Sequence, residues 1–185
     1  MLKKHFAVNI VSGLVLALAQ AGGLQAAVSY APPVSTSVGT ASTADADNPE
    51  YIAKGDLNND GFVDLVTVTV LLSNGSGGFS GVASYATNGN EPRQVAIGDL
   101  TGDGYADLVI PNVESVERGL TVLINNGSGG FVDAPGSPID LTPLMTAGAK
   151  PTSPVIADFD GNGVADVAVS GNGTSNNIQI LLGNN

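Results

Sequence analysis

Three nine-residue segments of the chain share an aspartate-rich pattern that could bind a hard cation. Each segment begins and ends with Asp and has Gly at its sixth position. Its third and fifth positions carry Asp, Asn or Thr, and the segments are 56–64, 99–107 and 158–166. Oxygen side chains at alternate positions of a tight turn, with a Gly that allows a sharp bend, are typical of calcium-binding loops.

The spacing within these three loops favours Ca²⁺ over other cations. Side chains at positions 1, 3 and 5 point inward around the turn, and the carbonyl of position 7 and the carboxylate of position 9 can close the cage. Such a flexible all-oxygen cage suits Ca²⁺ better than Mg²⁺, which keeps more of its own water. The alternative is that the segments are ordinary turns without an ion, although three converging carboxylates would then repel one another.

An EF-hand is a second alternative for such loops. An EF-hand has a bidentate Glu at position 12 of its loop and a helix on each side. Position 12 is occupied here by Thr67, Ile110 and Val169, and the flanking residues are rich in β-branched types. EF-hands and related helical loop pairs are therefore excluded.

The composition excludes further classes of function. The chain has 17 acidic and six basic residues, and nine of the acidic residues lie in the three loops. This balance argues against binding of nucleic acid or of an anionic membrane, because both require basic patches. The chain has no Cys, and its one His is His5, within an N-terminal segment that export would remove. Neither a Cys–His or Ser–His nucleophile nor a thiolate or imidazole zinc site is therefore expected in the rest of the chain.

Residues 1–27 resemble a secretory signal peptide, and residues 28–50 a flexible leader. Lys3 and Lys4 precede an apolar stretch over 8–19, and small residues near Ala26 supply a cleavage site. A single membrane-spanning helix is the alternative, but the apolar stretch is short for a bilayer. The Ala-, Ser-, Thr- and Pro-rich leader has no hydrophobic period, with a strand over 34–38 as its alternative. No other segment is expected to span a membrane.

From residue 51 onward, internal repetition predicts an all-β domain over 51–185. A short β-type run precedes each loop and another follows it, while no stretch of this part has a helical period. The first repeat is about nine residues shorter than the others, so 65–72 is expected to form one continuous strand. The Pro-rich segment 133–153 is expected to be an elaborated loop.

A second motif follows each pair of runs. Leu-Leu-Ser-Asn-Gly-Ser-Gly-Gly-Phe at 71–79 recurs almost unchanged at 123–131 and begins again at 181–185. Its Asn-Gly and Gly-Gly pairs favour a hairpin. Together, the loop, the Asp-Leu-Val that follows it and this second motif resemble the FG-GAP or integrin-alpha-type (VCBS-like) repeat of bacterial secreted proteins.

In that family each repeat is one four-stranded blade of a β-propeller. The resemblance therefore implies a partial propeller of about three blades, with the first blade shortened and the last truncated. The repeats would span about 51–93, 94–152 and 153–185. Three blades cannot close a ring, so the chain is expected to be a fragment of a longer protein, or to self-associate and cover its open sheet edges.

The resemblance also implies the ligands of up to three Ca²⁺ ions. Thr101 is a weak neutral ligand at position 3 of the second loop, which we expect to bind least tightly. The side chains expected to bind are Asp56, Asn58, Asp60, Asp64, Asp99, Thr101, Asp103, Asp107, Asp158, Asp160, Asn162 and Asp166, with the backbone carbonyls of Phe62, Tyr105 and Val164.

These features predict a secreted, calcium-binding module for binding or adhesion, located outside the cell, in the periplasm or at the cell surface. Its partner would be an extracellular protein or a glycan, presented to loops from several blades. One alternative is a structural scaffold or spacer for a catalytic domain on the same protein. A propeller-based carbohydrate-active enzyme is less favoured, because the acids outside the loops form no recognisable catalytic pair.

Overall fold

The computed structural model describes residues 10–11, 14–15, 51–67, 69–85, 92–113, 119–145, 148–173 and 177–184. The chain divides into two units, Met1–Thr36 and Ser37–Asn185. In the first unit, the described strands β1 (Ile10–Val11) and β2 (Leu14–Val15) pair antiparallel. The predicted leader at 28–50 lies outside the described residues. Among the described residues, no helix is long and apolar enough to cross a membrane.

The second unit consists of three antiparallel sheets, and its described residues form no helix, which confirms the all-β prediction. The first sheet has the order β3 (Ala53–Gly55), β4 (Asp64–Val66), β5 (Thr69–Ser73), β6 (Phe79–Ser84). The second has β7 (Ala96–Gly98), β8 (Asp107–Asn112), β9 (Gly119–Asn125) and β10 (Phe131–Asp133), and β11 (Ile139–Asp140) also pairs with β9. The third has β12 (Lys150–Ala157), β13 (Asp166–Asn172) and β14 (Ile178–Leu181).

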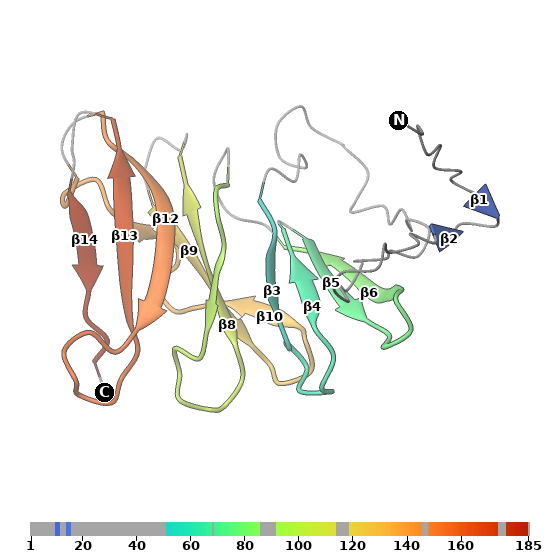
Figure 1. Ribbon diagram of the computed structural model, residues 1–185. Coiled ribbons are helices and arrows are strands. Elements are labelled where there is room, and N and C mark those ends of the chain that lie inside the picture. Colours follow the sequence, from blue (N-terminus) through green and yellow to red (C-terminus); the bar gives the residue numbers. More distant parts are fainter. Residues whose placement is uncertain are drawn as a thin grey trace, which may run out of the picture. The chain divides into compact units, whose positions relative to one another are not determined.

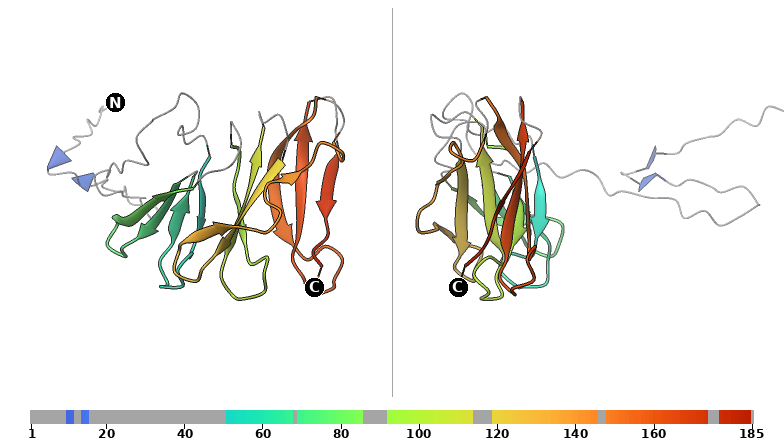
Figure 2. Two further views of the ribbon diagram at one scale, coloured as in Figure 1. Left: turned by 180° about the vertical axis from the view of Figure 1, so that it is seen from behind. Right: turned by 90° about the vertical axis from the view of Figure 1, so that its left-hand side faces the viewer.

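The three sheets follow one another in sequence order, with the second sheet between the other two (Figure 1). Sequential strands pair within each sheet, and the sheets form an open series rather than a closed ring, as a partial propeller would. The loops that join the first two strands of each sheet lie at one end of the unit, the lower end in Figures 1 and 2. The repeat thus brings its three Asp-rich loops to one side.

The first sheet corrects one prediction, because 65–72 is not a continuous strand. Leu65 pairs with Leu71 and Val66 with Val70, so β4 and β5 form a hairpin. The Thr67 N–H donates to the Thr69 carbonyl at 2.9 Å, and the Thr69 N–H donates to the Thr67 hydroxyl at 3.1 Å. The repeat is shorter because this turn is tight, and it keeps all four strands.

The Pro-rich segment 133–153 contains more regular structure than an elaborated loop. It includes β11 and the beginning of β12. Between them, the N–H groups of Leu144 and Met145 both donate to the Leu141 carbonyl at 3.0 Å. Leu141, Met145 and Ala149 are buried in the core between the second and third sheets. The segment therefore stabilises the packing of these two sheets.

The core consists of two apolar clusters, one on each face of the second sheet. Alternate residues of β8 supply both, because successive side chains of a strand point to opposite faces. Leu108 and Ile110 pack in the cluster shared with the first sheet, and Val109 packs in the cluster shared with the third sheet. Burial of each such side chain contributes about 1.5 to 3 kcal/mol. The second sheet is therefore held from both sides.

Candidate metal sites

Each loop folds around the carboxylate of its first Asp. In the third loop, Asp158 Oδ1 accepts the N–H groups of Gly161 at 2.7 Å and Asn162 at 3.1 Å, while Oδ2 accepts that of Gly163 at 2.9 Å. Gly163 has a φ of 85°, a left-handed conformation that favours Gly at this sixth position. Asp56 and Asp99 accept the equivalent Gly N–H groups at 2.9 Å. The local sequence thus pre-forms a turn that gathers oxygens.

In the third loop, these hydrogen bonds also favour the charged form of the Asp158 carboxylate. The Gly163 N–H is the main cause that lowers the pKa of Asp158, with smaller effects from the N–H groups of Gly161 and Asn162. A carboxylate that accepts backbone N–H groups is stabilised in its ionised form. Asp158 is exposed, so its remaining lone pairs are open to a cation.

The last Asp of each loop has a different environment. Asp64, Asp107 and Asp166 are buried, and both oxygens of each accept a backbone N–H. One N–H comes from position 2 of the same loop, at 2.7 to 2.9 Å. The other comes from the residue that follows the two apolar residues of the second motif, at 2.7 to 2.9 Å. The N–H donors to this second oxygen are those of Ser73, Asn125 and Gly183.

The ninth-position carboxylate therefore connects the two repeated motifs. A carboxylate offers about four lone-pair directions, so two backbone donors leave room for a cation. Desolvation by burial raises the pKa of Asp107, against the lowering effect of the N–H groups of Asn125 and Leu100. The nearby charge of Asp103 raises it further. A bound cation would relieve both costs, because an opposite charge favours the ionised form.

The third loop brings three predicted ligands together. Asp158, Asp160 and Asp166 each offer a carboxylate oxygen, and these oxygens lie within 4.8 Å of one another. Within the described part of the chain, this is the one group of three acidic side chains arranged in this way. Three hard anionic oxygens in one turn are the donor set that Ca²⁺ prefers. These residues fit the ion that the repeat pattern implies.

Neutral side chains at positions 3 and 5 lie close to carboxylates of their own loops. In the first loop, Asn58 Nδ2 donates to Asp60 Oδ2 at 3.0 Å. In the third loop, Asn162 Nδ2 donates to Asp160 Oδ2 at 3.1 Å. The Thr101 hydroxyl of the second loop lies 3.5 Å from Asp99 Oδ1, at the limit of a hydrogen bond. Each of these side chains therefore contacts or faces a carboxylate of its own loop.

The side chain at position 7 has a packing role that the sequence did not indicate. We predicted only that its carbonyl binds the ion. In the first loop, a Cβ on Gly75 would lie 2.5 Å from the ring of Phe62, and in the second, a Cβ on Gly127 would lie 3.0 Å from the ring of Tyr105. Both glycines belong to the second motif, where they also have positive φ. The aromatic ring therefore packs directly on the turn of that motif.

Asn125 is a further residue at the loops that sequence analysis missed. Its amide Nδ2 donates to the Leu57 carbonyl of the first loop at 2.7 Å and to the Ala106 carbonyl of the second loop at 2.9 Å. Its Oδ1 accepts the Gly127 N–H at 2.9 Å. The side chain is buried and joins two loops of neighbouring sheets. Its only signal in the sequence is its fixed place in the second motif.

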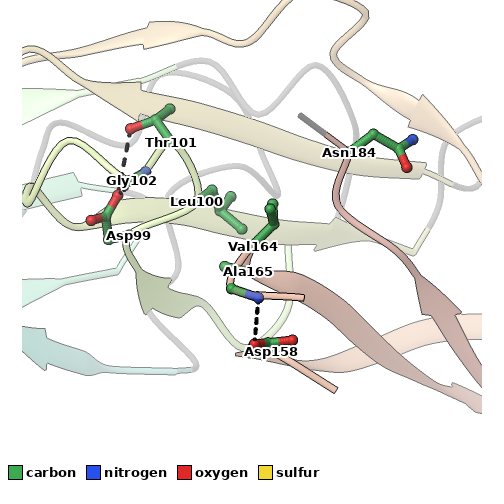
Figure 3. A pocket seen from close by; sticks show the side chains of 9 residues that line it. Asp99, Leu100, Thr101, Gly102, Asp158, Val164, Ala165 and Asn184 are labelled. Atoms are coloured by element: carbon green, nitrogen blue, oxygen red, sulfur yellow. Dashed lines mark hydrogen bonds between the residues drawn. The ribbon is translucent and has the colours of Figure 1, made fainter. Parts of the chain in front are cut away.

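A cleft of about 490 Å³ lies between the second and third loops. Its walls include Asp99 and Asp158, the first-position carboxylates of these loops (Figure 3). Thr101 and Val164 also line it. The cleft therefore belongs to the loop end of the unit and adds no separate group of chemically active side chains.

A sequence comparison identifies the repeat. The family model described as FG-GAP-like repeat matches residues 56–110 and 113–169, which together make up more than half of the chain. The first match begins at Asp56 and includes the first and second loops, and the second match includes the third loop. No curated protein matches the chain.

Proposed function

The chain belongs to the FG-GAP-like repeat family, and we propose that it is an exported, calcium-binding propeller-type module that binds an extracellular protein or glycan. The observation that carries the proposal is the grouping of Asp158, Asp160 and Asp166, whose oxygens lie within 4.8 Å of one another. The same pattern of residues recurs in the other two loops. Up to three ions would therefore bind at one end of the unit.

In this proposal, Ca²⁺ supplies positive charge at the point where carboxylates of one loop converge. In the third loop, the backbone N–H donors to Asp158 favour its ionised form, and its free lone pairs would be offered to the ion. The ninth-position carboxylate holds the loop against the end of the third strand in its sheet. We expect dissociation constants of about 10⁻⁴ to 10⁻³ M, as in other extracellular modules.

The export part of the proposal is based on the N-terminal sequence. Lys3 and Lys4, the apolar stretch over 8–19 and the small residues around Ala26 have the order of a signal peptide. We therefore assign the chain to the extracellular space, the periplasm or the cell surface.

We propose binding rather than catalysis. Two of the acidic residues outside the three loops lie in the described part of the chain. Asp133 ends β10 and Asp140 lies in β11, and both are exposed. Neither has the buried or paired environment that usually adapts a carboxylate for acid–base chemistry. Loops at one end of a rigid set of sheets are, by contrast, suited to contact a partner.

Calorimetric titration of the full chain with CaCl₂ tests the proposal. We expect Asp160→Ala to remove one site from the measured stoichiometry, because this exposed side chain contacts only its own loop. Asp140→Ala is the matched control, since Asp140 is an exposed acid outside the loops, and it should keep every site. Unchanged stoichiometry in Asp160→Ala would overturn the assignment of the third loop.

A further inference from the structure

On its outer face, the third sheet has apolar residues at the positions through which the other two sheets each pack on the next sheet. In the first strand of each sheet, one such position lies three residues before the Asp that begins the loop. Ala53 packs in the cluster between the first and second sheets, and Ala96 in the cluster between the second and third. The equivalent residue of the third sheet, Val155, is 54 % exposed.

The third strands of the sheets show the same difference. Val70 and Val122 are buried against the next sheet, whereas the equivalent Ile180 is 53 % exposed. Val155 and Ile180 both align with Ala168 in the strand register, so all three share one face. The exposed apolar side chains of this outer face are Val155, Ile178, Ile180 and Leu182. Contiguous exposed apolar side chains of this kind mark an interaction surface.

The first sheet, at the other end of the unit, has a partly exposed face. This face carries the residue position that, in the other two repeats, packs against the preceding sheet. Val95, four places before the second loop, is buried against the first sheet, and Pro154, its equivalent before the third loop, is buried too. Ile52 holds this position in the first sheet and is 67 % exposed. Two residues later, Lys54 is also exposed. One molecule therefore exposes both halves of the contact that joins its own sheets.

A glycine sets the fit of that contact inside the molecule. A Cβ on Gly55 would lie 3.2 Å from Cγ2 of Ile97 in the second sheet, and a Cβ on Gly98 would lie 2.9 Å from Cγ2 of Ile156 in the third. Each glycine thus leaves space for the branch methyl of an Ile from the next sheet.

On the outer faces of the first and third sheets, the positions that correspond to this Gly and this Ile carry different residues. The glycine position of the third sheet is Ala157, which has a methyl group, and the isoleucine position of the first sheet is Lys54, which has no branch at Cβ. In the internal contacts the methyl group belongs to the Ile and faces a Gly, whereas on the outer faces the methyl group belongs to Ala157 and Lys54 has no branch methyl. The two ends are therefore complementary to each other, whereas a further Ile would meet the Ala157 methyl.

We propose that the outer face of the third sheet binds the face of β3 that carries Ile52 and Lys54 in a second copy of this chain. This contact would bury Ile178 and Ile180 and place Lys54 at Ala157, directly before Asp158. A lysine next to an acidic loop adds charge complementarity between two copies that are otherwise both acidic. The contact is heterologous, so copies join head to tail. This assembly goes beyond the proposed function and does not depend on which partner the loops bind.

Mass measurement by light scattering on the full chain in CaCl₂ tests the proposal. We expect masses of two or more copies for the unmodified chain and a monomer for Ile180→Glu and for Ile52→Glu. Val132→Glu changes another exposed apolar residue, on β10, and should leave the association intact. A mixture of Ile180→Glu and Ile52→Glu should give dimers only, because one blocked end remains on each copy.

A pair of changes at the close contact provides the second measurement. Lys54→Ile should weaken association by about tenfold, because its branch methyl would meet Ala157 and the lysine charge is lost, and Lys54→Ile with Ala157→Gly should recover the part of this loss that the methyl contact causes. Circular dichroism of each variant checks the fold. A monomeric unmodified chain throughout the micromolar range would overturn the proposal and leave this face to a different protein. Association that survives Ile180→Glu would also overturn it.

Discussion

The second and third sheets are built from the same repeat, but they use it differently. All but one of the residues of β9, the third strand of the second sheet, are buried, whereas the side chains of β14, the equivalent strand of the third sheet, alternate between exposed and half-buried. Both strands carry apolar residues at the positions through which one sheet packs on the next. The difference arises because the second sheet has a neighbour on each side. The repeat specifies an apolar face, and packing of the next sheet decides whether that face becomes core.

Truncation of equivalent residues should give the largest contrast between these sheets. Leu120 of β9 is fully buried and Ile178 of β14, its equivalent, is 67 % exposed. We expect Leu120→Ala to lower the free energy of unfolding by about 2 to 5 kcal/mol, because it leaves a cavity. Ile178→Ala should change it by less than about 0.5 kcal/mol. Urea denaturation at low protein concentration measures both, and equal losses would contradict the comparison.

The buried ninth-position carboxylates should show a smaller contrast. Asp107 and Asp166 each accept two backbone N–H groups, and an Asn amide would direct its own N–H groups at one of these donors. We expect Asp107→Asn to cost about 1 to 3 kcal/mol in the absence of Ca²⁺. Asp166→Asn should cost less, because Gly183 is only half-buried and water can replace the lost acceptor.

The measurement for this pair is chemical denaturation in EDTA, which removes the contribution of the ion. Asp140→Asn serves as the control, since that carboxylate is exposed. A larger loss of unfolding free energy for Asp166→Asn than for Asp107→Asn would contradict this expectation. It would show that burial of the N–H donor beside a neighbouring sheet does not determine the loss.

Removal of Ca²⁺ should have the smallest effect. One millimolar Ca²⁺ at a site with a dissociation constant of about 10⁻⁴ to 10⁻³ M stabilises the folded chain by about 0.4 to 1.4 kcal/mol. We expect Asp160→Asn in the third loop to remove more of this stabilisation than Asp103→Asn in the second loop. Thr101 is a weaker ligand than Asp160 at the same loop position, so the second loop has less to lose. Melting temperatures with Ca²⁺ and with EDTA measure the difference.

The sequence predicted the features that depend on residues close together in the chain. The spacing of Asp158, Asp160 and Asp166 indicated a group of oxygens, and these carboxylates do meet in one loop. The β-type runs on either side of each loop, with no helical period in this part of the chain, predicted the strands and the all-β class. The continuous strand over 65–72 was wrong because residue counting cannot reveal a turn as tight as the one between Thr67 and Thr69.

The remaining features depend on which sheet lies next to which. The packing of Phe62 on Gly75 joins two motifs that are separated by a strand pair. The replacement of a glycine by Ala157, together with Lys54 in place of an isoleucine, has meaning only when neighbouring sheets are in position. A single sequence specifies these residues but does not indicate their partners.

The Asn125 side chain has a consequence for how the first two loops respond to an ion. Its amide donates to Leu57 of one loop and to Ala106 of the other, so each loop restrains the backbone of its neighbour. If an ion ordered the first loop, it would remove part of the conformational freedom that the second loop would otherwise lose on binding. The entropy would then be lost once for two events, which would give positive cooperativity without a change of shape. Asn125 thus couples the backbones of two loops through one side chain.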